Sequence, residues 1–260
     1  MPLHRVAAWA RHHATATDRH GVHSPFVFRL VNEVLRPTAP PAGTTDIEAL
    51  RAALLRDGRH IEVTDRGAGS RRMHGAQRRV RDIAAHALCT PRAAARLHRL
   101  ARFVNATNVL EMGTSLGITA LYLARAVPHG RVVTMEGCPA TLAIAREQFA
   151  AAGQHHIEAV AGDFRDTLPG VLDSMPAPDL AFIDGHHAED PTLRYYAQCM
   201  AHARPGAVIV LDDIHWSPGM ERAWRMIVGD PQATVTIDLH RMGLVFPYRE
   251  QAKEHFRLRY

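Results

Sequence analysis

Glycines and acidic residues follow three short apolar runs in the second half of the chain. The first run turns through Glu111-Met112-Gly113-Thr114-Ser115-Leu116-Gly117, and the next two end at Glu136 and at Gly162-Asp163-Phe164. Glycines between a strand and a helix let a ligand lie against the backbone. An acid about 20 residues beyond such a turn can accept hydrogen bonds from both ribose hydroxyls, and Glu136 has this spacing. The pattern predicts a nucleoside site at three strand ends, although a single acid there is more often solvated.

The glycine turn does not match a dinucleotide site. That fingerprint reads G-x-G-x-x-G and places a diphosphate on the helix N-terminus. Ser115 and Ile118 occupy its second and third glycine positions. The carboxylate of Glu111 before the turn is also unfavourable for a diphosphate and suits a cationic ligand. A nicotinamide oxidoreductase is therefore disfavoured.

The elements that carry these residues alternate between strands and helices from residue 108 onward. This alternation is typical of a parallel sheet with crossover helices. The predicted strands are Asn108–Met112, Arg131–Glu136, Ile157–Ala161, Leu180–Asp184 and Ala207–Leu211, followed by an antiparallel hairpin of Thr234–Leu239 and Leu244–Tyr248. The first hundred residues predict helices instead, with caps at Ser24-Pro25 and Thr90-Pro91 and a capping box at Thr45-Asp46-Ile47-Glu48.

Composition agrees with a globular protein. The 260 residues are 47% hydrophobic and 22% charged, and the 3 cysteines form no C-x-x-C pair, so a reducing cytoplasm is expected. No stretch is apolar enough for a membrane span or a signal peptide. Residues 56–102 hold 12 arginines against 4 acids. A solvated helix face is favoured over a nucleic-acid surface, because no aromatic residues interleave these arginines.

Residues 105–260 resemble the class I S-adenosylmethionine-dependent methyltransferases, on the strength of the glycine turn, Glu136, Asp163 and the terminal hairpin. The resemblance implies an α/β Rossmann-like sheet of seven strands in the order 3-2-1-4-5-7-6, with strand 7 antiparallel. Residues 1–104 would form an N-terminal helical extension, and its segment 21–28 resembles part of an uncharacterised group of bacterial methyltransferase-like proteins. The cofactor would be S-adenosylmethionine, with Glu136 on the ribose, Asp163 on the adenine beside Gly162 and Phe164, and the amino-acid and sulfonium end held by Glu111, Gly113, Thr114, Ser115 and Gly117.

Within that class the chain is most similar to small-molecule O-methyltransferases of the catechol and caffeoyl-CoA type. In that group acids at the ends of strands 4 and 5 hold a divalent cation, which here implies Asp184, Asp212 and Asp213 as ligands of Mg²⁺ or another cation. The third of these acids replaces an asparagine, so a metal-free site stays open, and Asp184 can instead contact the cofactor. His187, three residues after Asp184, stands where the catechol group has a basic lysine, and His215 is a second candidate base.

The sequence thus predicts a cytoplasmic bacterial enzyme of class EC 2.1.1.- that methylates an oxygen of a small molecule. Two alternatives stay open: an RNA or protein acceptor bound through the arginine-rich segment 56–102, and a non-catalytic protein that only binds S-adenosylmethionine. The arginines would make RNA binding depend on salt. No membrane partner is expected, and a homodimer is possible on this pattern.

Overall fold

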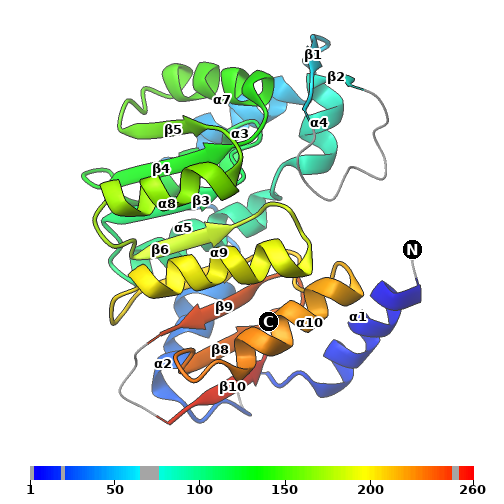
Figure 1. Cartoon of the computed structure of the whole chain (residues 1–260), viewed down its shortest axis with the longest axis vertical. Helices are drawn as coiled ribbons and strands as arrows, with labels where there is room; N and C mark the ends of the chain where they lie inside the picture. Colours follow the sequence, from blue (N-terminus) through cyan, green and yellow to red (C-terminus); the bar gives the residue numbers. More distant parts are fainter. Residues whose placement is uncertain (1–2, 19–20, 65–75, 248–251) are drawn as a thin grey trace.

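One eight-stranded sheet runs through the protein, and helices cover both of its faces (Figure 1). The structure is a computed structural model that describes residues 3–18, 21–64, 76–247 and 252–260. The sheet order is β10-β8-β9-β7-β6-β3-β4-β5. Its strands are β3 (Asn108–Met112), β4 (Arg131–Glu136), β5 (Ile157–Ala161), β6 (Leu180–Ile183), β7 (Val208–Leu211), β8 (Val235–Asp238), β9 (Gly243–Phe246) and β10 (Glu254–Arg257).

The predicted topology is confirmed. Without β10, the strands numbered from β3 run 3-2-1-4-5-7-6 across the sheet, and β9 is antiparallel to both β7 and β8. The sequence did not predict β10, which pairs parallel to β8 and extends the sheet at that edge. This strand has four residues with exposed or half-buried side chains, so it carries no apolar alternation to signal it.

Helices after each strand return the chain across the sheet. They are α6 (Ile118–Ala126), α7 (Pro139–Ala151), α8 (Phe164–Ser174), α9 (Glu189–His202) and α10 (Pro218–Gly229). The sequence did not predict α8, because Pro169 and Gly170 in its middle are typical of a loop. Ser217 caps α10 by accepting a hydrogen bond from Met220 N–H, as expected before a proline.

The N-terminal part is mostly helical, as predicted. It consists of α1 (Leu3–Thr15), α2 (Pro25–Leu30), the π-helical turn η2 (Val31–Leu35), α3 (Thr45–Leu54), a hairpin of β1 (His60–Glu62) and β2 (Gln77–Arg79), α4 (Val80–Ala87) and α5 (Pro91–Phe103). Ser24 and Thr90 cap α2 and α5 as expected. The capping box at Thr45 is wrong: the helix begins one residue earlier than that motif requires, with Thr44 as its N-cap, and the Thr44 hydroxyl donates to Pro41 O.

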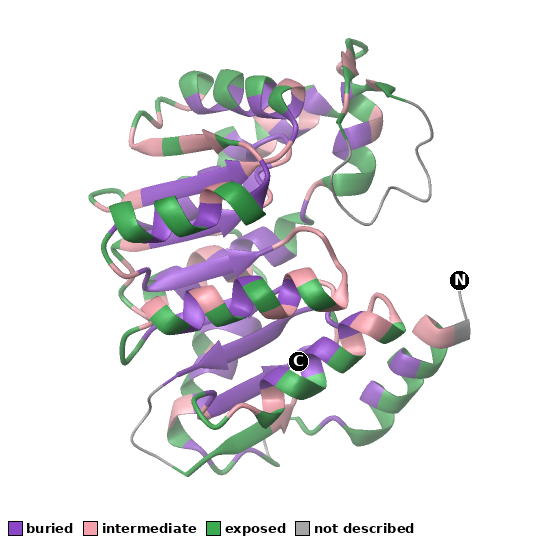
Figure 2. Cartoon of the chain, in the orientation of Figure 1, coloured by how far each residue is buried: buried purple, intermediate pink, exposed green. Residues whose placement is uncertain are grey.

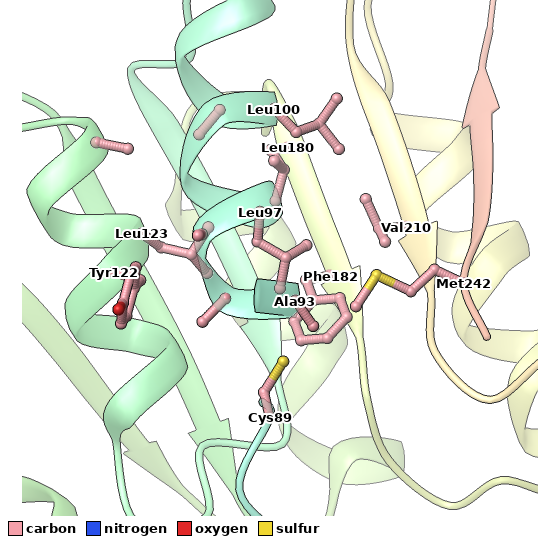
Figure 3. Close-up of a cluster of buried hydrophobic side chains, with 14 of the residues drawn as sticks. Cys89, Ala93, Leu97, Leu100, Tyr122, Leu123, Leu180, Phe182, Val210 and Met242 are labelled. Atoms are coloured by element: carbon pink, nitrogen blue, oxygen red, sulfur yellow. The ribbon is translucent and has the colours of Figure 1, made fainter. Parts of the chain in front are cut away.

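Two hydrophobic clusters fill the two sides of the sheet (Figure 2). One joins α8, α9 and α10 to one face. The other joins α6 and α7 to the opposite face together with the N-terminal helices α2 to α5. Figure 3 shows α5 beside α6, with Leu97 near Phe182 and Leu100 near Leu180 of the sheet. The N-terminal helices therefore share a core with the sheet, which fixes their position over it.

Candidate active site at the carboxyl ends of the strands

A cavity of about 280 Å³ opens at the carboxyl ends of β3, β4, β5 and β6. Parallel α/β sheets bind ligands at this edge. Six of the residues that the sequence singled out line the cavity, namely Gly113, Ser115, Glu136, Asp163, Phe164 and Asp184. Glu111, Thr114, Gly117 and Gly162 were predicted with them but are not part of the lining, so the structure brings together a little over half of the predicted cofactor set.

Backbone strain gathers at the same edge. Ser115, His186, Asp213 and His240 all have positive φ, between 47° and 67°, in the loops that follow β3, β6, β7 and β8. A left-handed conformation is costly for residues with a Cβ and is retained mostly where a functional site needs it. Four such residues in four neighbouring loops mark this edge of the sheet as a built site.

The glycine turn positions the acid of the next strand. The backbone N–H of Ser115 donates to Glu136 Oε2 at 2.8 Å, and that of Cys138 donates to Oε1 at 2.9 Å. Each carboxylate oxygen keeps a further lone pair for a ligand. Gly113 has φ 113°, and a Cβ on it would lie 2.1 Å from the carbonyl oxygen of Asp184. Only glycine fits there, and the serine takes the left-handed conformation where a dinucleotide site would have glycine.

Glu111 lies beneath this turn and has no exposed surface. Its Oε2 accepts from the Thr134 hydroxyl at 2.5 Å, and Thr134 in turn shares a hydrogen bond of 2.6 Å with Thr114. Oε1 has no hydrogen-bond partner. Burial raises the pKa of Glu111 to about 8, against the effect of the Thr134 hydrogen bond and with that of the nearby Glu136 charge. At neutral pH this carboxyl group is therefore mostly neutral.

Gly117 and Asp163, which the sequence predicted to bind the cofactor, both have structural roles. Gly117 has φ 87°, and a Cβ on it would lie 2.7 Å from Phe149 Cε1, so its absence lets α6 pack close to α7. Asp163 caps α8 and pairs with Arg165, which lowers its pKa to about 2. Phe164 packs edge-on against the ring of His186 at 5.6 Å and forms one wall of the cavity.

The acids predicted to hold a metal are arranged around an arginine. Arg241 donates from Nε and Nη2 to both carboxylate oxygens of the buried Asp212, at 2.9 to 3.3 Å, and its Nε lies 3.8 Å from Asp213. Burial and the neighbouring aspartate charges raise the pKa of Asp184 well above its usual range. Among the described residues, the three aspartates are not a group whose ligand atoms could share one ion. The predicted Mg²⁺ set does not fit this arrangement, because a guanidinium occupies Asp212.

The candidate bases have three different environments. His187 is not in the cavity lining, but its Nε2 lies 3.5 Å from Oδ1 of Asp184, which is. His186, which the sequence did not select, lines the cavity, and its Nδ1 shares a 2.8 Å hydrogen bond with the Tyr195 hydroxyl. His215 is not in the lining: Nδ1 faces Glu221 and Nε2 faces Asp238, at 2.9 and 3.0 Å. The structure therefore places it away from the predicted reaction site.

The N-terminal part supplies one side of the cavity through Val63, Thr64, Arg78, Ile83, His86 and Ala87. These residues lie after β1, in β2 and on α4, and no sequence motif predicted them as part of the site. Several arginines of segment 56–102 have partners within the protein. Arg59 pairs with Asp57 and Glu147, and Arg99 donates to Ala39 O. These contacts give part of the arginine-rich segment a structural explanation; residues 65–75 lie outside the described part of the chain.

No described helix is both long enough and apolar enough to cross a lipid bilayer. Cys89, Cys138 and Cys199 are free and buried. Of these three, Cys138 lines the cavity.

Comparison with known proteins gives the same fold. A family profile described as "Methyltransferase domain" matches residues 110–214. Two similar curated proteins are the catechol O-methyltransferases of Niastella koreensis and Mycobacterium tuberculosis. The first is 33% identical over 121 residues, which is 45% of this chain and 54% of the relative. The second is 41% identical over 117 residues, or 44% and 51%. The chain thus spans about half the length of these relatives.

A solved structure with the same arrangement is the O-methyltransferase TomG of Streptomyces achromogenes, involved in tomaymycin synthesis and crystallised with S-adenosylmethionine. It is 28% identical, covers 62% of this chain and 82% of its own, and superimposes with a TM-score of 0.56. Residues 110–214 therefore match the model of a methyltransferase domain, and the sheet has the Rossmann-like fold of S-adenosylmethionine-dependent methyltransferases.

Proposed function

We propose that this protein transfers a methyl group from S-adenosylmethionine to an oxygen of a small molecule. The observation that carries the proposal is the fixed carboxylate of Glu136, which two strand-end loops hold at the cavity. The similarity to catechol O-methyltransferases supports an oxygen acceptor.

The residues of the cavity suit a nucleoside with a cationic end. Glu136 would accept hydrogen bonds from the ribose hydroxyls, and Gly113 would let the ligand approach the backbone. Phe164 offers an aromatic surface for the base. When bound, S-adenosylmethionine supplies an electrophilic methyl group on its sulfonium sulfur.

The acceptor would lie between Asp184 and the α4 side of the cavity. Ile83 and Ala87 give that side an apolar surface, which suits a small organic ring. His187 would take the proton of the acceptor hydroxyl, and Asp184, whose Oδ1 lies 3.5 Å from His187 Nε2, would orient the ring. The remaining contribution of the protein is alignment of the acceptor oxygen with the methyl carbon. No step of this scheme uses a metal.

Calorimetric titration with S-adenosylmethionine and S-adenosylhomocysteine tests the cofactor part. Micromolar binding is expected, with NADH as the negative control. Glu136→Gln should weaken it on the order of 10 to 100-fold, because hydrogen bonds to a charged group contribute about 1.5 to 3 kcal/mol. Glu33→Gln is the matched control, since Glu33 is exposed on η2 and pairs with Arg29 far from the cavity lining. Absence of binding to both sulfur nucleosides would overturn the proposal.

Turnover of a catechol panel, measured with and without EDTA, tests the chemistry. Asp184→Asn and His187→Gln should lower kcat at least about 100-fold, the usual scale of general base catalysis. Their affinity for S-adenosylmethionine should stay within a few fold. An equal loss of cofactor affinity in Asp184→Asn would assign Asp184 to the cofactor site instead. Tight cofactor binding with no transfer to any acceptor would favour the non-catalytic alternative.

A further inference from the structure

Three histidines form a cluster outside the cavity, where α1 meets the C-terminal strands. His12 comes from α1, His215 from the loop after β7, and His240 from the turn between β8 and β9. One ring nitrogen of each lies within 4.8 Å of the others. Figure 1 shows α1 beside α10 at the same end of the sheet as β8 and β10. Residues this far apart in sequence have thus been brought to one point.

Two of the rings are held on their outer side by one nitrogen and face Asp238 with the other. His12 Nε2 lies 3.2 Å from the carbonyl oxygen of Leu258, and its Nδ1 faces Asp238 Oδ1 at 3.1 Å. His215 Nδ1 lies 2.9 Å from Glu221, and its Nε2 is 3.0 Å from Asp238 Oδ2. An outer carbonyl or carboxylate on the distal ring nitrogen is the arrangement that orients histidine ligands of metals.

The third ring has a buried nitrogen with no partner. His240 Nδ1 is covered by protein and makes no hydrogen bond. Its backbone φ is 67°, and the backbone N–H donates to Asp238 Oδ1 at 2.8 Å, which fixes the turn beneath the ring. A buried polar nitrogen without a partner costs free energy, so its retention needs an explanation.

The spacing suits a tetrahedral ion. Donor atoms at about 2.0 to 2.1 Å from a tetrahedral zinc lie roughly 3.3 Å apart, and rings bound to one zinc have centroids roughly 5 Å apart. The ring of His240 is 5.2 Å from that of His12 and 5.4 Å from that of His215, and the rings of His12 and His215 are 6.4 Å apart. Two of the three separations are close to those that a shared ion would impose, and the third would have to shorten when the ion binds.

We propose that His12, His215 and His240 form a Zn²⁺ site that fastens α1 to the sheet. Imidazole nitrogens are ligands that zinc accepts in tetrahedral sites. Asp238, which pairs with Arg257 at 3.3 Å, is not one of the ligands, so protein would fill three positions and water the fourth. The site is separate from the proposed catalytic cavity, and Asp184, Asp212 and Asp213 take no part in it.

The site can be tested by zinc binding to the full chain after removal of any affinity tag. The protein is stripped with EDTA, dialysed, and titrated with Zn²⁺ in competition with a chromogenic chelator. We expect one Zn²⁺ per chain with a nanomolar or lower Kd, as for structural zinc sites. Zinc should also raise the melting temperature in proportion to its occupancy, whereas magnesium should not.

Two ligand variants and one control make the test specific. His12→Gln and His240→Asn should each weaken zinc binding at least about 100-fold, since losing even an outer partner costs 10 to 100-fold. Asparagine tolerates the left-handed backbone of position 240, so this variant keeps the turn. His13→Gln is the control, because His13 is the exposed neighbour of His12 on the same helix.

Circular dichroism in EDTA shows whether each variant folds. Co²⁺ should give the visible absorption of a tetrahedral complex in the native protein and in His13→Gln only. Binding of no zinc by the native chain, or equal losses in His13→Gln and His12→Gln, would overturn the proposal. Either result is independent of methyl transfer, which is measured separately.

Discussion

Glu111 is a carboxyl group without exposed surface, and its ionisation should control how the stability of this protein varies with pH. In the unfolded chain its pKa is the ordinary 4.5, and burial raises it to about 8 in the folded state. Between these values the folded state keeps a proton that the unfolded state has lost. Stability from this group is therefore complete at pH 4.5 and decreases as the pH rises toward 8.

The size of the effect follows from the pKa difference of about 3.5 between the two states. At about 1.36 kcal/mol for each pH unit, the folded state loses on the order of 4 to 5 kcal/mol across the range. Glu111→Gln removes the ionisation while keeping the shape of the side chain and an oxygen that can accept from the Thr134 hydroxyl. The variant should gain that stability relative to the native chain between pH 5 and pH 9, with most of the gain complete near pH 8.

Urea unfolding at a series of pH values measures this difference. Other titrating groups are common to both proteins, so they largely cancel when the two are compared at each pH. A relative shift of the midpoint by more than about 1 M urea is expected, given an m-value of about 1 to 3 kcal/mol per M. Coinciding fluorescence and circular dichroism transitions would show that the free energy is defined. Parallel stability curves for the two proteins would refute the reasoning.

Three further changes test the packing and the hydrogen bonds. Gly113→Ala should destabilise the fold by more than about 2 kcal/mol in a thermal melt and abolish cofactor binding, because its Cβ would meet Asp184 O. Gly153→Ala is the control: Gly153 also has positive φ but faces open space, so this variant should cost about 1 kcal/mol in the same melt. Asp179→Asn should cost about 1 to 3 kcal/mol at pH 7, because Asp179 accepts from Thr107 and Asn108. Burial alone would raise the pKa of Asp179, but its hydrogen bonds outweigh burial and lower that pKa. The destabilisation by Asp179→Asn should therefore shrink below about pH 4, and a destabilisation that stays constant in acid would contradict the prediction. Leu97→Ala should cost about 2 to 5 kcal/mol in chemical denaturation, while the exposed Leu55→Ala should change stability by less than about 0.5 kcal/mol.

The sheet could be predicted from the sequence because its signals are local. The strands β3 to β7 are nearly continuous apolar runs, and glycine or proline ends each helix that was predicted between them. Where local signals are weak or misleading, prediction failed. Helix α8 was not predicted because Pro169 lies inside it, and β10 was not predicted because its polar residues show no alternation of apolar and polar side chains.

The site was predictable in part for the same reason. Glycine and acid positions at strand ends follow from the fold, and Glu136 and Asp184 do line the cavity. The role of His215 depends on Asp238 and Glu221, and that of Asp212 depends on Arg241. Such partners come from other elements, so their presence cannot be read from neighbouring sequence. The ionisation of Glu111 could not be predicted from the sequence either, because it depends on the burial of this side chain beneath the glycine turn.

The contacts of α1 also have a consequence for the order of events during synthesis. His12 contacts Leu258, Arg11 pairs with Glu221, and Thr17 forms a bridge with Leu258. A lone helix of 13 residues is marginal in water. At about 5 to 20 residues per second, the ribosome needs roughly 10 to 50 s after making α1 to supply the residues on which it docks. Helix α1 is therefore made before the residues on which it docks and is among the last of the described helices to find its place.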